Sequence, residues 1–237
     1  MSSNFGFRKI DYPKDKSLVI YGAGEFARIA KHYFETDAGI KVENFVIDDE
    51  FVVNSDDYMF QGKPVFSESH FLKNKNPEKY CYFVAYSARN LSFPRMRKVQ
   101  QISSRGLECI SYISSRSFVD LDSTFGNNVF VFENNTLQTE VDVGDGTVIW
   151  SGNHIGHQTK IGKANFISSH VCIGGRVNIG NNCYLGMNST VRDMINMGDK
   201  TVLGANSFIN NDFLGNGVLV GSPAKRVDGK DPLMVIK

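Results

Sequence analysis

A polar string near the middle of the chain carries two histidines, His154 and His157, with Asn153 before them and Gln158 after them. Histidine is suited to accept a proton near neutral pH, because its unperturbed pKa lies close to that pH. Such a side chain can act as a general base that takes a proton from an attacking nucleophile. The string therefore predicts general-base chemistry, whereas the more distant His170 is interpreted as structural.

The histidines lie within a long sequence repeat. From Ile113 to Ile209 every sixth residue is apolar, and the residue after it is glycine in nine of the seventeen repeats. A helix needs a period of about 3.6 residues and an ordinary strand a period of two. A period of six instead fits short strands separated by turns, which coil as a parallel β-helix. In this arrangement the histidines occupy positions that do not face the core.

The repeated pattern, an aliphatic residue, glycine and then a small residue, resembles that of the left-handed β-helix acyltransferases. The resemblance implies the handedness of the coil, since the spacing alone does not give it. After the last repeat, the segment 221–226 is similar to a G-x-P-A-[KR] segment that borders the coenzyme A groove in that family. The pairs that carry the resemblance best are Ile161-Gly162, Ile173-Gly174, Ile179-Gly180, Leu185-Gly186 and Leu203-Gly204.

The first hundred residues follow a different pattern. A buried strand is predicted over 16–21, and it leads through Gly22-Ala23-Gly24 into an amphipathic helix over 25–34. A second strand over 42–47 ends in Asp48-Asp49. This order is typical of a Rossmann-like βαβ unit, in which amides at a helix amino terminus face a phosphate. A tight turn without a ligand is the alternative, and about 110 residues are too few for the two halves of a dinucleotide site.

A half-Rossmann unit beside a hexapeptide repeat resembles the family that acylates nucleotide-linked sugars. That family includes bacterial amino-sugar N-acetyltransferases and sialic-acid O-acetyltransferase-like proteins. The resemblance implies an α/β nucleotide-sugar-binding domain over 1–110 and a left-handed parallel β-helix acyltransferase domain with a carboxyl-terminal tail over 111–237. The residues that match its nucleotide-sugar site are Gly22, Ala23, Gly24, Glu25, Asp48, Asp49 and Gly62.

The same resemblance places His157 on the catalytic histidine of the family, with His154, Asn153 and Gln158 as supporting residues. A carboxylate follows that histidine in the characterised enzymes, whereas Gln158 follows it here, which leaves Asp142 of a neighbouring coil as a substitute. Another family histidine, which contacts acetyl-CoA, is replaced by Phe166, and this leaves a bulkier acyl donor or a different acceptor open. The remaining residues that match the acetyl-CoA site are Gly175, Met187, Ala205 and Lys225.

These matches predict a homotrimeric, acetyl-CoA-dependent N-acyltransferase that acts on the amino group of a nucleotide-linked amino deoxysugar in surface-glycan synthesis. Acylation of a sugar hydroxyl and a non-catalytic scaffold are the alternatives. A zinc site like that of the γ-class carbonic anhydrases is not expected, because the spacing of His154, His157 and His170 does not match theirs. A nucleotidyltransferase would carry an arginine close behind the glycines, where Glu25 stands instead.

Composition narrows the partners and the compartment. The formal net charge is +1 over 237 residues and shows no basic stripe, so nucleic acid is not an expected partner. We expect no membrane insertion, because the sequence has no long apolar run and its first residues lack a signal-peptide core. Four cysteines without a CxxC pair favour a reduced, cytoplasmic protein.

Overall fold

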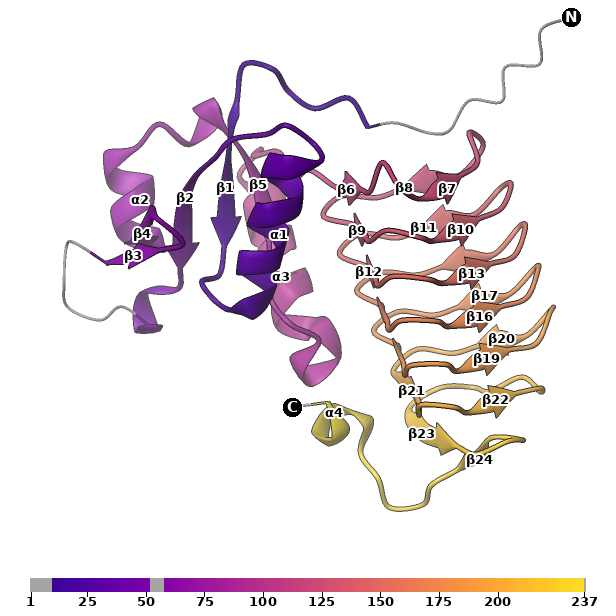
Figure 1. Cartoon of the computed structure of the whole chain (residues 1–237). Helices are drawn as coiled ribbons and strands as arrows, with labels where there is room; N and C mark the ends of the chain where they lie inside the picture. Colours follow the sequence, from indigo (N-terminus) through magenta and orange to yellow (C-terminus); the bar gives the residue numbers. More distant parts are fainter. Residues whose placement is uncertain (1–9, 52–57, 237) are drawn as a thin grey trace, which may run out of the picture.

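The computed structural model describes residues 10–51 and 58–236, which form an α/β unit followed by a β-helix (Figure 1). Both parts of the predicted fold class are confirmed, the Rossmann-like βαβ unit first and the coiled repeat second. In Figure 1 the α/β unit lies along one side of the stacked coils, with α1 (Glu25–Thr36) and α3 (Phe93–Ser104) nearest to them. The expectation that the first residues lack a signal-peptide core concerns residues that lie partly outside the described part, which begins at residue 10.

The central strand of the α/β unit is β1 (Ser17–Tyr21), which is apolar on both faces. Leu18 and Ile20 pack against α1, whereas Val19 and Tyr21 pack on the side of α2 (Glu68–Asn74) and α3. The sheet order is β3-β4-β2-β1-β5. Three further strands form parallel pairs in this sheet, namely β2 (Val42–Ile47), β4 (Lys63–Ser67) and β5 (Tyr80–Val84). The edge strand β3 (Met59–Phe60) is antiparallel to β4. The short 3₁₀ helices are η1 (Asp49–Phe51), η2 (Pro77–Lys79) and η3 (Arg89–Ser92).

Each repeat forms one short strand, and strands eighteen residues apart pair in parallel, as Thr136 does with His154. Three sheets result, and the repeated apolar side chains fill the space between them. The strands of the coils are β6 (Tyr112–Ile113), β7 (Phe118–Val119), β8 (Thr124–Phe125), β9 (Phe130–Val131), β10 (Thr136–Leu137), β11 (Asp142–Val143), β12 (Val148–Ile149), β13 (His154–Ile155), β14 (Lys160–Ile161), β15 (Phe166–Ile167), β16 (Cys172–Ile173), β17 (Asn178–Ile179), β18 (Tyr184–Leu185), β19 (Thr190–Val191), β20 (Asn196–Met197), β21 (Thr201–Leu203), β22 (Phe208–Ile209), β23 (Gly217–Val220) and β24 (Lys225–Arg226).

The turns between these strands share one backbone geometry. The residue three after the repeated apolar position adopts a left-handed conformation, with φ of 58° at Gln158 and 55° at Asn182. Asparagine and glycine tolerate this conformation better than most residues. The turns stack along three edges of the prism. We call them the docking edge (Asn128, Gly146, Ala164, Asn182, Lys200), the histidine edge (Glu140, Gln158, Arg176, Met194) and the third edge (Asn134, Gly152, His170, Asn188, Asn206).

The α/β unit is fixed to the coils by a shared aromatic core. Tyr33 and Phe34 of α1 pack against Phe130, and Tyr33 also packs against Phe132. The Tyr33 hydroxyl donates to Glu133 Oε2 over 2.8 Å. Burial of these rings makes the junction between the two parts a continuation of the α/β core rather than a hinge.

The chain returns to the α/β unit after the last coil. The short helix α4 (Pro232–Val235) is followed by Ile236, whose carbonyl accepts a hydrogen bond of 3.1 Å from the Asn90 amide in η3. The four cysteines are free, and Cys172 is the exposed one among them. Within the described residues, no helix has the length and apolarity needed to cross a membrane.

Candidate functional site

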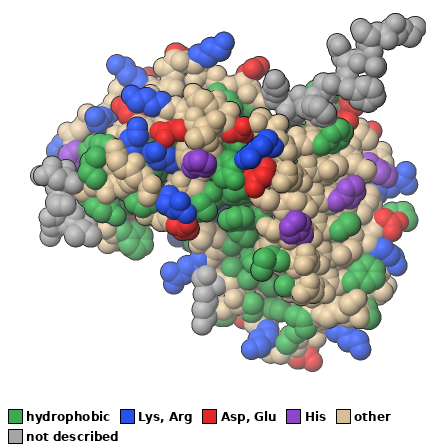
Figure 2. All heavy atoms as spheres, in the orientation of Figure 1, with side chains coloured by type: hydrophobic (Ala, Val, Ile, Leu, Met, Phe, Trp, Pro, Cys, Tyr) green, Lys and Arg blue, Asp and Glu red, His purple; other side chains and the backbone are tan. Residues whose placement is uncertain are grey.

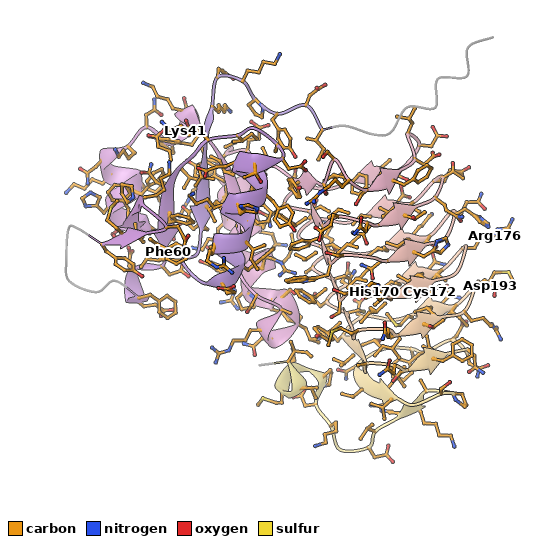
Figure 3. The ribbon with its side chains drawn as sticks, in the orientation of Figure 1. Lys41, Phe60, His170, Cys172, Arg176 and Asp193 are labelled. Atoms are coloured by element: carbon orange, nitrogen blue, oxygen red, sulfur yellow. The ribbon has the colours of Figure 1, made fainter. Side chains whose placement is uncertain are left out.

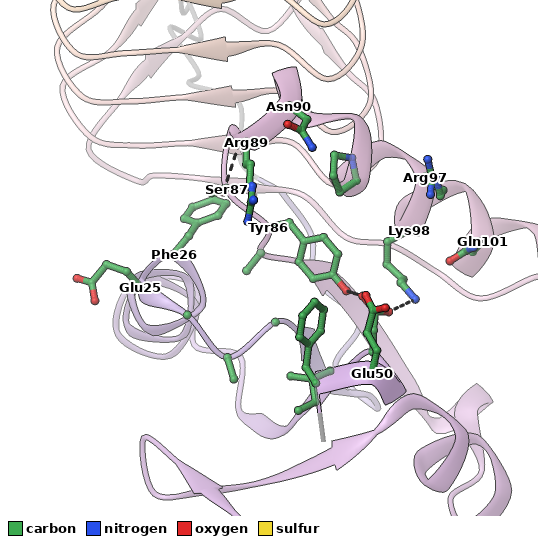
Figure 4. A pocket seen from close by; sticks show the side chains of 18 of the residues that line it. Glu25, Phe26, Glu50, Tyr86, Ser87, Arg89, Asn90, Arg97, Lys98 and Gln101 are labelled. Atoms are coloured by element: carbon green, nitrogen blue, oxygen red, sulfur yellow. Dashed lines mark hydrogen bonds and ion pairs between the residues drawn. The ribbon is translucent and has the colours of Figure 1, made fainter. Parts of the chain in front are cut away.

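A cleft of 970 Å³ opens at the carboxyl ends of β1, β2 and β5 (Figure 4). The chain runs from β1 to β2 and β4 on one side and returns to β5 on the other, so the strand order reverses between β1 and β5. Ligands of open α/β sheets bind at such a reversal point. The cleft is lined by the 22–26 turn, by the end of β2 and by the segment from Ala85 to Gln101.

The glycine turn forms the floor of this cleft. Gly22 has φ of +110°, and its amide donates to the Val46 carbonyl over 2.7 Å. A side chain there would lie 3.3 Å from the Ala85 carbonyl oxygen, so the turn needs glycine for both reasons. Gly24 is the N-cap of α1 and provides no side-chain cap, which leaves the first amides of the helix for an anion. Glu25 lines the cleft and pairs with Arg28 one turn later.

Asp48 lines the cleft and is held from two sides. Lys98 Nζ lies 2.6 Å from Asp48 Oδ1, and the Tyr86 hydroxyl donates to Asp48 Oδ2 over 2.9 Å (Figure 4). Lys98 also lies 2.7 Å from Glu68 Oε2. Burial raises the pKa of the Glu68 carboxyl, but the bonds from Lys98 and Arg105 outweigh it and leave that pKa below its ordinary value. The network fixes the position of the Asp48 carboxylate at the cleft.

The other two residues predicted for this site have different surroundings. Asp49 is not among the residues that line the cleft, and its Oδ1 accepts a bond of 3.0 Å from the Ser69 amide in the first turn of α2. This bond lowers the pKa of the Asp49 carboxyl and satisfies a helix amide that has no partner within the helix. Gly62 lies in the turn between β3 and β4 with φ of +71°, also outside the cleft lining.

The wall opposite the glycine turn carries positive charge and backbone strain. Arg89 and Arg97 line the cleft, and in the described part of the chain neither guanidinium pairs with a carboxylate. Asn90, Leu91 and Ser92 are consecutive left-handed residues, with φ of 50°, 49° and 63°. A left-handed conformation costs an L-residue other than glycine roughly 1–2 kcal/mol, so surrounding contacts must hold this segment.

His157 lies on the histidine edge with its side chain exposed. Its ring rests over Gly175 of the next coil, where a Cβ atom would lie 2.7 Å from His157 Nε2. The Gln138 side chain accepts the His157 amide proton over 2.9 Å and anchors the backbone. Among the described residues no protein acceptor takes the Gly175 amide proton. An imidazole and a free amide thus lie together, as general-base attack on a thioester requires.

Gln158 belongs to a ladder of polar side chains on the same edge. Its Nε2 donates to Glu140 Oε2 over 3.1 Å, and its Oε1 accepts from Arg176 Nε over 3.1 Å. Each contact joins residues one coil apart. Asp142, the proposed substitute for the missing carboxylate, accepts a bond from the Thr124 hydroxyl, one coil away in the same sheet. Glu140 is therefore the carboxylate that the structure connects to the residue after His157.

Asn153 and His154 are consecutive in sequence, but the Asn153 side chain is buried in the coil and the His154 side chain is exposed. Asn153 is 2% exposed, its Oδ1 accepts the Val171 amide over 2.6 Å, and its Nδ2 donates to the Trp150 carbonyl. It therefore holds the backbone of two coils together inside the turn. His154 is exposed on β13 and pairs in register with Cys172. His170 lies on the third edge against Gly152, and Figure 2 shows histidine side chains spread over this face of the coils.

The residues predicted for acetyl-CoA lie in several places on one chain. Gly175 is beside His157, while Met187 and Ala205 occupy equivalent turns of adjacent coils on the third edge, with Met187 60% exposed. Phe166 lies on the sheet that faces the α/β unit and stacks on Tyr184 with ring centroids 5.4 Å apart. Lys225 is exposed on β24.

The cleft and His157 lie on different sides of the molecule. The α/β unit docks along the docking edge and on the sheet that contains Phe130 and Phe166. The histidine edge joins the other two sheets, and Figure 3 shows Arg176 and Asp193 of that edge at the far margin of the coils. A ligand in the cleft of one chain therefore does not reach His157 of the same chain. Within the described residues no cluster of three histidine, cysteine or acidic residues has the arrangement of a metal site.

Known proteins share both the repeat and the whole fold. Residues 158–193 match the family model of the bacterial transferase hexapeptide (six repeats). A mutant of perosamine N-acetyltransferase from Caulobacter crescentus, solved with CoA and GDP-perosamine, is 21% identical with a TM-score of 0.79, covering 89% of this chain and 96% of that one. No curated protein matches.

Two further solved structures have the same two-part architecture. WeeI from Acinetobacter baumannii is 16% identical with a TM-score of 0.73, and the acetyltransferase domain of PglB from Neisseria gonorrhoeae is 20% identical with a TM-score of 0.67. Each alignment covers 90% of this chain and 100% of the other. The predicted resemblance to hexapeptide-repeat acyltransferases is confirmed, and the fold is shared with perosamine N-acetyltransferase and with the acetyltransferase domain of PglB.

Sequence reasoning missed several residues that the structure brings into these places. Tyr86, Lys98, Arg89 and Arg97 reach the cleft from the segment after β5. The sequence signal for them is the apolar run 80–85 directly before this segment, because a third parallel strand there would end at the same edge of the sheet. Glu140 had a clearer signal, because it precedes Gln158 by the eighteen residues of one coil.

Proposed function

We propose that the protein is an acyl-CoA-dependent transferase that moves an acetyl group from acetyl-CoA to the amino group of a nucleotide-linked amino deoxysugar, in the synthesis of a surface glycan. One observation carries this proposal. A single chain holds a nucleotide-sized cleft at the reversal point of an α/β sheet and an exposed imidazole over a free amide on hexapeptide coils. The solved structures with this fold include one in complex with CoA and GDP-perosamine.

The cleft suits the nucleoside diphosphate end of such a substrate. The first amides of α1, behind Gly22, Ala23 and Gly24, offer donors to a phosphate. Arg89 and Arg97 on the opposite wall supply the positive charge that a diphosphate requires. Asp48 is held in place to accept hydrogen bonds from the nucleoside. In this proposal Asp49 and Gly62 shape the cleft from outside rather than touch the ligand.

His157 acts as the general base in the proposed reaction. The amine nitrogen attacks the thioester carbonyl carbon, an N–C bond forms, and the amine proton passes to the imidazole. The C–S bond then breaks, and the coenzyme A sulfur leaves as a thiolate that takes up a proton. The Gly175 amide faces the oxyanion, and such a donor contributes about 3 kcal/mol to lowering the barrier. No covalent acyl-enzyme is needed.

The separation of the two places on one chain supports a shared site in a homotrimer. The sugar held by one α/β unit would meet His157 of a neighbouring coil, and the pantetheine arm would lie between coils near Met187 and Ala205. Light scattering that shows a stable, active monomer would refute the shared site, because the cleft and His157 of one chain lie on different sides.

The test is release of free thiol from acetyl-CoA in the presence of dTDP-, UDP- and GDP-linked 3- and 4-amino deoxysugars. We expect turnover with one of these sugars and its loss in His157→Ala. Absence of turnover with every amino sugar, while acetyl-CoA still binds, would reject amine acylation by this protein.

Acylation of a sugar hydroxyl is the second candidate. Gln158 is fixed between Glu140 and Arg176 and brings no charge of its own to the imidazole, which is a departure from the N-acetyltransferase pattern. The same base would accept a hydroxyl proton. Thiol release with the matching hydroxyl sugars, and not with the amino sugars, would identify this reaction. A protein that binds neither acyl-CoA nor a nucleotide would instead be a scaffold.

A further inference from the structure

The docking edge of the β-helix contacts one short segment of the α/β unit on several successive coils. Asn128 exchanges two hydrogen bonds with the backbone of Val84, donating to its carbonyl over 3.1 Å and accepting from its amide over 2.6 Å. The Asn182 side chain donates to the Leu91 carbonyl over 2.8 Å. Lys200 Nζ lies 5.8 Å from the centre of the Phe93 ring. One edge of the coils therefore follows the chain from the end of β5 to the start of α3.

Arg95 joins this edge to the cleft wall. Its side chain is fully buried, and Nε donates to the Gly146 carbonyl of the docking edge over 2.9 Å. The other end of the same guanidinium donates to the Tyr86 carbonyl over 2.8 Å and to the Ser92 hydroxyl over 2.7 Å. Among the described residues no carboxylate bonds this guanidinium, and backbone carbonyls receive most of its hydrogen bonds. This pattern fixes the path of a loop rather than balancing a charge.

The held segment is the strained wall of the cleft. Asn90, Leu91 and Ser92 are left-handed in succession, which no local sequence preference provides for leucine. Leu91 is 1% exposed and packs in a cluster with Val202 and Val218 of the coils and with Ile236 of the tail. The Asn90 amide is bonded to the Ile236 carbonyl. The wall thus keeps its shape through contacts from the coils on one side and from the tail on the other.

We propose that Arg95, Asn182 and Ile236 are positioning residues for the nucleotide cleft, and that the β-helix and the tail together serve as the template on which the wall at 86–92 is held. The inference rests on the proposed nucleotide-linked substrate. When a contact is lost, the wall spends part of its time in relaxed conformations that do not bind the nucleotide. The apparent nucleotide affinity then falls in proportion to the fraction of molecules that keep the binding conformation. Acyl-CoA binding, which uses other parts of the coils, stays unchanged.

The experiment measures the Kd of GDP, UDP and dTDP, and of CoA, by calorimetry on the full chain and its variants. Asn182→Gly removes the bond to Leu91, and glycine keeps the left-handed turn at φ of 55°. Asn134→Gly is the matched control, because Asn134 occupies the same turn position at φ of 59° on the third edge and its side chain is exposed. A chain that ends at Lys230 removes α4 and Ile236.

We expect the Kd of the nucleotide to rise roughly fivefold in Asn182→Gly, which corresponds to the usual net contribution of one hydrogen bond. The shortened chain should lose about tenfold or more, as a wall competent for a tenth of the time would. Both variants should keep the Kd of CoA, and both should exchange the Asn90 and Ser92 amide protons faster than the wild type. Arg95→Met should show the largest loss if it folds, and the other two variants decide the question if it does not.

Three results would overturn the inference. Wild-type nucleotide affinity in Asn182→Gly and in the shortened chain would show that the wall needs no template. Equal losses for nucleotide and CoA would show a general loss of structure instead of positioning. If the wild-type chain binds none of the three nucleoside diphosphates, the proposed function of the cleft fails together with this inference, which distinguishes that outcome from the first two.

Discussion

The histidine edge and the cleft are built on different principles. On the histidine edge, side chains contact residues of the adjacent coil, as Gln158 contacts Glu140 and Arg176, each eighteen positions away. In the cleft, Asp48 is held by Tyr86 and Lys98, which come from separate elements at unrelated spacings. In the repeat, the period of eighteen residues per coil determines which residues become neighbours. The residues of a cleft at a sheet edge depend instead on how helices and loops pack. Changes on the histidine edge should therefore alter chemistry alone, and changes around the cleft should alter stability as well.

The largest expected effect is that of His157→Ala. Loss of a general base lowers turnover by roughly 10²–10⁴-fold. Because the His157 side chain is exposed, its removal should leave thermal unfolding unchanged. The measurement is the rate of thiol release from acetyl-CoA with a saturating sugar acceptor.

The matched control for this variant is His170→Asn. His170 lies on a different edge with φ of 60°, and asparagine tolerates that conformation. We expect it to keep wild-type turnover. Near-normal turnover in His157→Ala would remove His157 from the mechanism and with it the chemical role of the histidine edge.

The next effect is that of Gly175→Ala, which tests the fit between two coils. The added Cβ atom would lie 2.7 Å from His157 Nε2, so the imidazole must move. A displacement of about 1 Å in a catalytic group lowers the rate by up to about 10²-fold. Kinetics of Gly175→Ala, His157→Ala and the double variant would check this. Since both changes act through one ring, the double variant should be no slower than His157→Ala, and additive losses would contradict the contact.

A third prediction concerns the pH dependence of stability near the cleft. The Glu68 carboxyl has a pKa below its ordinary value of 4.5, so its contribution is complete above that pH and is lost as the pH falls through the lowered pKa. We expect the wild-type chain to lose more stability than Glu68→Gln as the pH falls from neutral to acid. Urea unfolding of both proteins across this range measures the difference. Parallel pH profiles would show that the Lys98 network adds nothing to stability.

The sequence predicts more of the histidine edge than of the cleft, because the repeat determines neighbours on the edge and long-range packing determines them in the cleft. The period of six predicted the strands, the inward side chains and the outward position of His157, because each repeat obeys one rule. The βαβ unit and the turn at Gly22 were also readable, since a strand, glycines and a helix are local signals. Which of Asp48 and Asp49 enters the cleft was not readable, because the choice depends on where the first turn of α2 lies.

Asn153 and Arg95 show the other limit of sequence reasoning. A polar residue beside two histidines suggested chemistry, yet Asn153 is buried and bonds the backbone of adjacent coils. Nothing in the sequence around Arg95 marks it as special, yet its side chain is fully buried and bonds the coils as well as the α/β unit. Both are decided by long-range packing that no local pattern encodes.

The smallest expected effect is that of Gln158→Glu, which tests whether the side chain after His157 influences the imidazole. Gln158→Glu introduces the carboxylate that the sequence lacks after His157, and Arg176 of the next coil is placed to pair with it. A nearby carboxylate favours the protonated imidazole, so the acidic limb of the kcat/KM profile should move to higher pH. The rate at its optimum should change by less than about tenfold, since the base itself remains.

Glu140→Gln is the companion variant for this prediction. Glu140 bonds Gln158 in the wild type, and in Gln158→Glu it would face a like charge one coil away. Adding Glu140→Gln to Gln158→Glu removes one of the two carboxylates, so the double variant should show the smaller displacement of the acidic limb. An unmoved limb in both would mean that the side chain at 158 does not act on His157, and that the ladder from Glu140 to Arg176 only holds the coils in register.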